Sequence, residues 1–140
     1  MSEAPKYPLF VKVDCYQLSV NDLDAALRFY RDALGHELVW RSETAAGLRM
    51  PGGDSELVLQ TERPEAETDL LVESVGEAVE RFVVAGGRLI RGPFEIQIGL
   101  CAVVMDPFAN VLVMLDMSKG RLVTDAEGRI VGNEGAEPSG

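Results

Sequence analysis

Four polar side chains form two matched pairs, and their chemistry sets the range of functions open to this chain. Cys15 and Gln17 alternate along one apolar segment, and Glu67 and Asp69 do the same fifty-two residues later. Carboxylate and amide oxygens can ligate a divalent cation or hold a polar group of an organic ligand, and a thiol can act as a nucleophile. No histidine lies near Cys15 in the sequence to serve as its base, so we interpret Cys15 as a packed, unreactive thiol.

The segments that carry these pairs belong to an internal repeat. An apolar strand, an amphipathic helix and a glycine that ends the helix occur twice in the same order. The first copy has Leu18, Val20, Ala26, Leu27, Tyr30 and Gly35, and the second has Leu70, Val72, Ala78, Val79, Phe82 and Gly87. Two related half-sheets can cover each other by enclosing a shared interior, so we expect a cavity between the halves.

Periodicity and turn residues predict the remaining elements. The first half is expected to contain a strand at 10–20, a helix at 22–34 capped by Asn21 or Asp22, and strands at 37–41, 47–50 and 56–61. After a linker at 62–67, the second half repeats the scheme with a strand at 69–73, a helix at 75–85, and strands at 88–90, 100–105 and 111–116. We expect one domain at 10–117 with halves at 10–62 and 68–117, an added hairpin at 118–132 and a disordered tail at 133–140.

Composition narrows the class of protein. The 140 residues are 46% hydrophobic and 26% charged, which is typical of a soluble globular domain. A formal net charge of −10 disfavours nucleic acid and anionic membrane surfaces as partners. The sequence contains neither a long apolar span nor a signal-like opening, so we expect a cytoplasmic protein whose two cysteines are reduced and buried.

Three short segments resemble the vicinal oxygen chelate superfamily, the group of glyoxalases, extradiol dioxygenases, fosfomycin-resistance transferases and bleomycin-binding proteins. They are Val20-Asn21-Asp22-Leu23, the run from Phe29 to Gly35, and Asp106-Pro107-Phe108-Ala109-Asn110. The resemblance covers roughly residues 10–117. It implies an α+β fold in which tandem βαβββ modules form a curved mixed sheet around a cavity. Related proteins commonly pair, and we expect this chain to form a homodimer. Ala109 replaces the usual glycine of its turn, so we expect that turn not to need a positive φ.

The resemblance also implies where a metal ion would be held. Enzymes of this superfamily place His, Glu or Gln near the start of the first strand of each half and near the end of each half. Carried over to this chain, those places fall on Cys15, Leu59, Glu67 and Val113. Two of the four are aliphatic and cannot coordinate a cation, and His36, the only histidine, is interpreted as an exposed residue. A set displaced by one residue, using Gln17, Gln60 or Asp69, remains an alternative.

Without a metal, the fold can still bind a ligand, as bleomycin-type members do. The residues expected to line the cavity are Cys15, Gln17, Trp40, Arg49, Leu59, Glu67, Asp69, Gln97, Cys101 and Val113. Several have a purely structural alternative. Trp40 could equally be a core or dimer-contact residue, Arg49 could be solvated, and Gln17 could satisfy a backbone group.

Three functions remain open from the sequence. The first is a metal-free protein, without a cofactor, that binds a small hydrophobic or planar organic molecule. The second is a lyase or dioxygenase of the same superfamily that uses one divalent metal ion, and the third is a protein-interaction module. The aliphatic residues at two donor positions favour the first over the second, and ligand identity is not encoded in any motif.

Overall fold

The computed structural model describes residues 7–135, and the first βαβββ module comes first along the chain. Its elements are strand β1 (Lys12–Ser19), helix α1 (Leu23–Leu27) with its π-helical continuation η1 (Arg28–Ala33), and strands β2 (Leu38–Arg41), β3 (Ala45–Arg49) and β4 (Glu56–Gln60). Asp22 caps the helix, as predicted, because its Oδ1 accepts a 3.0 Å hydrogen bond from the Ala25 N–H. The helix widens near its end, where the Leu34 N–H bonds the Phe29 carbonyl five residues earlier.

The second module repeats this order. It contains strand β5 (Glu67–Leu71), helix α2 (Val75–Val84), and strands β6 (Arg88–Glu95), β7 (Leu100–Met105) and β8 (Val111–Leu115). Ser74 caps α2 by accepting a hydrogen bond from the Glu77 N–H at 3.3 Å. Local capping and the apolar period of 3.6 residues therefore define both helices in the same way.

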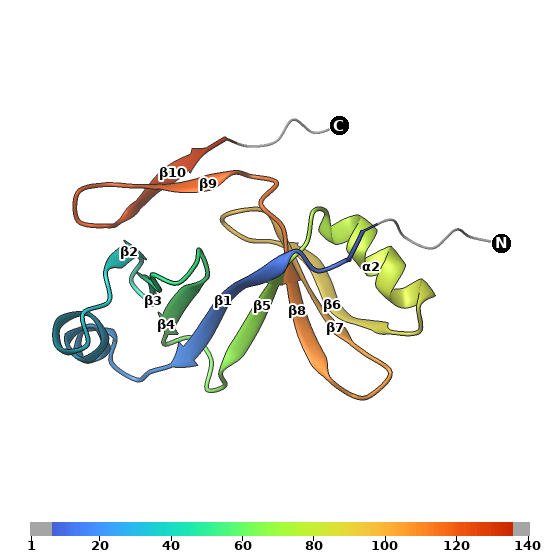
Figure 1. The fold of residues 1–140 in the computed structure, drawn as a ribbon, viewed down its shortest axis with the longest axis horizontal. Helices are drawn as coiled ribbons and strands as arrows, with labels where there is room; N and C mark the ends of the chain where they lie inside the picture. Colours follow the sequence, from blue (N-terminus) through green and yellow to red (C-terminus); the bar gives the residue numbers. More distant parts are fainter. Residues whose placement is uncertain (1–6, 136–140) are drawn as a thin grey trace.

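All eight of these strands form one mixed sheet in the order β2-β3-β4-β1-β5-β8-β7-β6. The modules meet at the antiparallel pair β1 and β5, and each of these strands is parallel to the last strand of its own module. Figure 1 shows the modules side by side with this pair between them. The predicted α+β fold of tandem βαβββ modules is confirmed.

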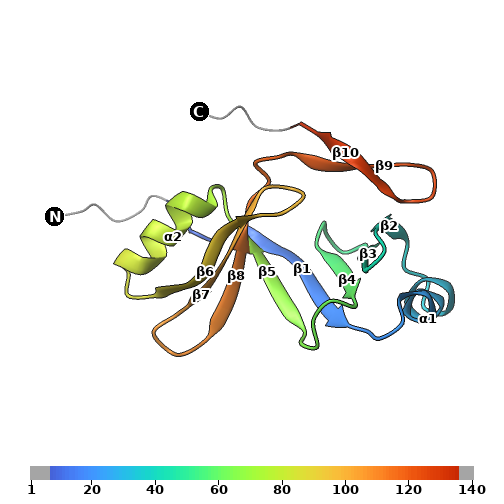
Figure 2. The same cartoon turned by 180° about the vertical axis from the view of Figure 1, so that it is seen from behind.

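The helices cover one face of the sheet and leave the other without helices. Helix α1 packs its apolar side on β3 and β4, and α2 packs on β7 and β8. The buried residues of these two cores are Leu23, Ala26, Leu27, Ala46, Leu48 and Leu59 under α1, and Val72, Val75, Ala78, Ala102, Val104 and Met114 under α2. Figure 2 shows the two helices at opposite ends of the molecule. We call the opposite side of the sheet the helix-free face.

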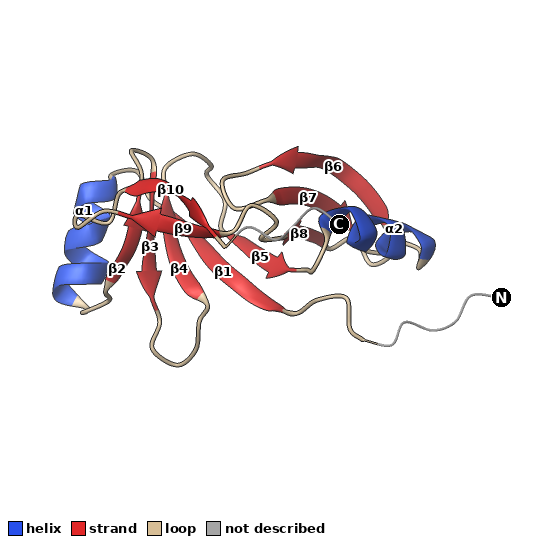
Figure 3. Ribbon diagram, turned by 90° about the horizontal axis from the view of Figure 1, so that it is seen from above, coloured by secondary structure: helices blue, strands red, loops and turns tan. Residues whose placement is uncertain are grey.

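A two-stranded hairpin follows the repeat. Strands β9 (Arg121–Thr124) and β10 (Ile130–Glu134) pair with each other and form a separate small sheet (Figures 1 and 3). The hairpin touches both modules, since the Gly128 carbonyl accepts from the Arg41 N–H of β2, and Asn133 bonds Gln97 in the β6–β7 loop. The division into a domain at 10–117 and an added hairpin stays a prediction.

Three local expectations were wrong. Strand β6 extends to Glu95 rather than stopping at 90, because bulges let it pass Gly92 and Pro93 while keeping its pairing with β7. Asn133 and Glu134, expected to belong to a disordered tail at 133–140, pair with β9 instead; residues 136–140 of that expected tail lie outside the described residues. Ala109 does adopt a positive φ of 69°, because the turn closes through hydrogen bonds to Asp106.

Within residues 7–135, none of the helices has both the length and the apolar character that crossing a membrane requires.

Candidate functional site

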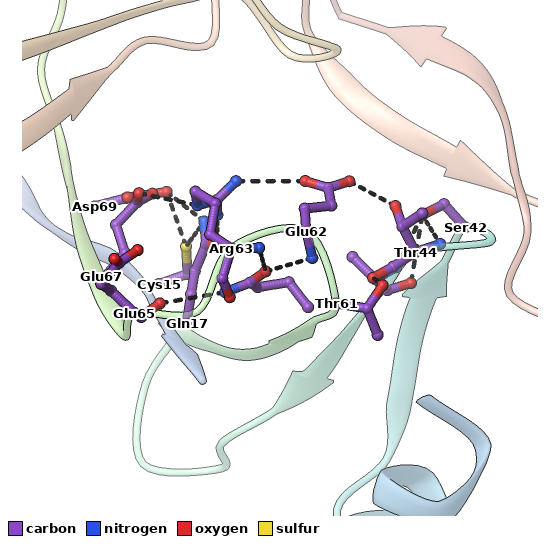
Figure 4. A network of polar contacts seen from close by, with 12 residues as sticks. Cys15, Gln17, Ser42, Thr44, Thr61, Glu62, Arg63, Glu65, Glu67 and Asp69 are labelled. Atoms are coloured by element: carbon purple, nitrogen blue, oxygen red, sulfur yellow. Dashed lines mark hydrogen bonds and ion pairs between the residues drawn. The ribbon is translucent and has the colours of Figure 1, made fainter. Parts of the chain in front are cut away.

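The two matched polar pairs meet where the modules join. The antiparallel register places Cys15 opposite Asp69 and Gln17 opposite Glu67, so all four side chains lie on the helix-free face. Asp69 Oδ2 accepts hydrogen bonds from Gln17 Nε2 at 2.9 Å and from Cys15 Sγ at 3.4 Å. Figure 4 shows these contacts at one end of a longer polar network. The predicted juxtaposition of these four residues is therefore present in the structure.

Arg63, a residue that the sequence analysis had assigned only to a linker, is part of this network. Its guanidinium donates to Gln17 Oε1, and its Nε lies 3.5 Å from Glu67 Oε1. Its Nη1 also contacts Glu62 Oε1 at 3.3 Å. A loop cation thus bridges the first strands of both modules (Figure 4). Arginine in a linker is common, and no sequence signal distinguished this one.

The second residue that sequence reasoning undervalued is Gln60, at the end of β4. It is buried, and its amide makes four hydrogen bonds to the loop that follows. Its Oε1 accepts from the N–H groups of Glu62 and Arg63, each at 2.8 Å, and its Nε2 donates to the carbonyls of Arg63 and Glu65. The strand period of two was a usable signal, since it puts Glu56, Val58 and Gln60 of β4 on the face of Gln17.

Burial shifts the pKa values of the acidic and thiol groups in this cluster. Asp69 is 4% exposed, and burial, followed by the adjacent Glu67 carboxyl, raises its pKa to about 8. Burial and then the Asp69 charge raise the pKa of the Cys15 thiol far above its ordinary value. Burial likewise raises the pKa of Cys101 to about 12. Both thiols are neutral at physiological pH, so the interpretation of Cys15 as an unreactive thiol agrees with its surroundings.

Apolar side chains border the polar cluster on the same face. The parallel registers place Val58 beside Gln17 and Val113 beside Asp69. Val113 belongs to a buried group with Cys101 and Leu115 from β7 and β8. The helix-free face therefore combines a polar centre at β1 and β5 with apolar walls on both sides, a composition common in small-molecule sites.

Leu59 does not belong to this face, and its prediction was wrong. It is fully buried and packs with Leu23 and Leu27 of α1. Because side chains alternate along a strand, an error of one residue in alignment moves a side chain to the opposite face. Val58 occupies the position on the helix-free face that we had expected Leu59 to hold.

Three other expected lining residues lie away from the polar cluster. Trp40 packs over Gly47, and its indole Nε1 donates to Glu56 Oε1 at 2.7 Å. Arg49 is exposed and pairs with Glu37 at 3.0 Å, which is the solvated alternative. Gln97 bonds Asn133 of the hairpin at 2.5 Å. The structure thus gives each of them partners of its own outside the Cys15–Asp69 cluster.

A surface cleft of about 870 Å³ lies at the end of β1, beside the start of α1. Its lining includes Asp22, Phe29, Tyr30, Glu62 and Arg63. It contains none of the ten residues predicted to line a cavity, but it does share Arg63 with the polar network. A smaller hollow of about 200 Å³ is lined by Arg49 and Glu56, among others. Arg63 therefore connects the polar cluster with the larger cleft.

The four donor places implied by the resemblance do not form a complete ligand set for a divalent metal ion. Val113 is aliphatic, Leu59 is aliphatic and lies in the core under α1, and Cys15 has a neutral thiol. Val58, the neighbour of Leu59 that lies on the helix-free face, is aliphatic as well. Glu67, at the fourth place, lies beside the Arg63 cation. Among the described residues, no group of three or more His, Cys, Asp and Glu side chains is arranged to hold a metal ion.

Comparisons with known proteins agree with this fold. Methylmalonyl-CoA epimerase from Mycobacterium tuberculosis has a TM-score of 0.67 at 17% identity, over 81% of this chain and 92% of that one. Homoprotocatechuate 2,3-dioxygenase from Brevibacterium fuscum, in complex with 3,4-dihydroxyphenylacetate, has a TM-score of 0.59 at 25% identity, over 81% of this chain and 39% of that one. A search of curated protein sequences finds no match to the chain.

Sequence comparison identifies the family directly. Residues 12–114 match the family model described as Glyoxalase/Bleomycin resistance protein/Dioxygenase superfamily, and this span includes both modules from β1 into β8. The fold, the order of the motifs and this match all agree. The chain therefore belongs to the glyoxalase/bleomycin resistance protein/dioxygenase superfamily.

Proposed function

We propose that this protein is a metal-free member of its superfamily that binds a small hydrophobic or planar organic molecule on the helix-free face. The observation that carries the proposal is that Val113 lies on that face at one implied donor place, while Leu59, at a second, lies in the core and has the aliphatic Val58 beside it on the helix-free face. Aliphatic side chains at these places cannot coordinate a cation, and they can contact an apolar ligand.

The remaining residues suit binding better than covalent chemistry. The Cys15 and Cys101 thiols are buried and neutral, so neither is a ready nucleophile. Gln17 and Asp69 hold each other in fixed orientations, which lets them orient a polar group of a ligand. The runner-up function is a divalent-metal-dependent lyase or dioxygenase, since the superfamily name includes both glyoxalases and dioxygenases.

Metal analysis separates the two functions. Protein purified without exposure to a chelator should contain well under one equivalent of Zn, Mn, Ni or Fe per chain. The reason is that the helix-free face lacks a complete set of metal ligands. Elemental analysis measures the metal content. One tightly held equivalent would overturn the proposal and favour the lyase or dioxygenase.

Replacing Val113 with Trp tests the place of binding. The neutral, planar fluorophore N-phenyl-1-naphthylamine serves as the probe. An indole at this 8% exposed position should fill the apolar wall and weaken probe binding by about tenfold, which corresponds to about 1.4 kcal/mol. The control is Val84→Trp, because Val84 is 84% exposed at the end of α2.

Far-UV and near-UV circular dichroism first establish that both tryptophan variants remain folded. Unchanged probe affinity in a folded Val113→Trp protein would show that the probe does not bind on the helix-free face. A wild-type protein that does not bind the probe at all would count against an apolar ligand of this kind.

A further inference from the structure

The side chain of Arg63 contacts an amide oxygen and two carboxylates that come from different parts of the chain. Its guanidinium contacts Gln17 Oε1 from β1 and approaches Glu67 Oε1 from β5 at 3.5 Å. Both contacts lie at the centre of the helix-free face, where the first strands of the two modules pair. Figure 4 shows the guanidinium between the Glu67–Asp69 side of the network and Glu62.

The loop holds Arg63 in this place rather than leaving it free. Four hydrogen bonds from the buried Gln60 amide fix the backbone of residues 62, 63 and 65. Glu62 in turn contacts the residue before β3, because Thr44 Oγ1 donates to its Oε2 at 2.5 Å. A backbone fixed at several points limits the positions open to the Arg63 side chain.

The polar groups of this region are not fully paired. Among the described residues, the buried atoms Asp69 Oδ1 and Arg63 Nε both have no hydrogen-bond partner. Glu67 contributes a carboxylate and Gln17 an amide oxygen to the same small region. Carboxylate and amide oxygens of this kind are the ligands that hard divalent cations prefer.

We propose that the Arg63 guanidinium is the built-in cation of this face, and that it takes the place a divalent ion would otherwise hold between the two modules. This inference rests on the proposed metal-free function, and it attributes the exclusion of a metal ion to one residue, Arg63. A guanidinium is charged at all accessible pH values and cannot be lost to a chelator. It also excludes a metal ion by position and by charge repulsion.

Removal of the guanidinium should therefore create a cation site. In the Arg63→Met variant, Gln17 Oε1 and Glu67 Oε1 lose the guanidinium, and the buried Asp69 carboxyl, which bonds Gln17, lies beside them. We therefore expect one Mn²⁺ to bind per chain with a Kd on the order of 10⁻⁴ M. Loss of the free Mn²⁺ signal in electron paramagnetic resonance measures this binding. Wild-type protein should leave the signal unchanged at the same concentrations.

Two further variants establish which residues are responsible for the Mn²⁺ binding. Arg63→Met combined with Glu67→Gln should lose most of the acquired Mn²⁺ affinity, because one of the two carboxylates is gone. Arg49→Met removes an arginine that pairs with Glu37 outside the cluster, so this variant should bind no Mn²⁺. Mn²⁺ should also raise the melting temperature of Arg63→Met and leave that of the wild type unchanged. Arg63→Gln replaces the Met variant if the latter does not stay folded.

The possible outcomes separate this inference from the function on which it rests. If neither the wild type nor the neutral Arg63 variants bind Mn²⁺, the proposal that Arg63 replaces a metal ion is wrong, while the proposed metal-free function is not contradicted. If the wild type already binds one equivalent, both are wrong. Mn²⁺ binding by Arg49→Met would show a site elsewhere and would also overturn the inference.

Discussion

Asp116→Ala is expected to lower the free energy of unfolding by about 4 kcal/mol, because several backbone groups depend on its buried carboxylate. Asp116 is 2% exposed. Its Oδ2 accepts from the N–H of Val75 in the first turn of α2 at 2.9 Å, and its Oδ1 accepts from the N–H of Leu100 at the start of β7 at 2.9 Å. Ser118 adds bonds from both its N–H and its hydroxyl. One side chain thus connects α2, β7 and the segment after β8.

Urea denaturation monitored by circular dichroism measures this loss. Asp125→Ala provides the matched control, because Asp125 Oδ1 also accepts two backbone hydrogen bonds, but in the exposed turn of the β9–β10 hairpin. That variant should lose less than about 1 kcal/mol. Equal losses of unfolding free energy in the two variants would show that the burial of Asp116 does not add to its contribution to stability.

The same carboxylate predicts a pH dependence. Burial acts to raise the pKa of Asp116, but the hydrogen bonds from Val75, Leu100 and Ser118 outweigh burial and lower the pKa below its ordinary value near 3.8. Because the folded-state pKa is the lower one, the stabilisation is present above the unfolded-state value and disappears as the pH falls through the folded-state value. The wild type should therefore lose its stability advantage over Asp116→Ala only in strongly acidic solution.

Leu59→Ala is expected to destabilise the fold by about 2–5 kcal/mol, because it removes a fully buried side chain from the core under α1. The residue packs between the helix and β3, so the surrounding side chains can fill the resulting cavity only in part. Affinity for N-phenyl-1-naphthylamine should not change in the folded variant, since Leu59 lies on the face opposite the proposed site. Thermal or urea denaturation and fluorescence titration measure the two quantities.

Leu34→Ala is the control for this substitution, because Leu34 is 54% exposed beyond η1 and its truncation should cost less than about 1 kcal/mol. A stable Leu59→Ala protein with weakened probe binding would contradict the position of Leu59 in the core. It would restore the expectation that this residue lines the ligand site.

Many features of the fold could be predicted from local patterns in the sequence. The fifty-two-residue repeat, the Asp22 cap and the glycine after the first helix predicted two modules of the same element order. These signals are local, because capping bonds and the apolar period act within a few residues of the chain. The alternation of Cys15 with Gln17 and of Glu67 with Asp69 likewise predicted which side chains share a face.

The tertiary structure alone decided how those faces meet. The one-residue difference between Leu59 and Val58 depends on the parallel register of β1 and β4, which joins residues about forty positions apart. The role of Arg63 depends on a loop held by the Gln60 amide, and that of Asp116 on three segments distant in sequence. Contacts of this kind leave no periodic trace, because they are set by the packing of whole elements and not by the neighbours of a residue in the chain.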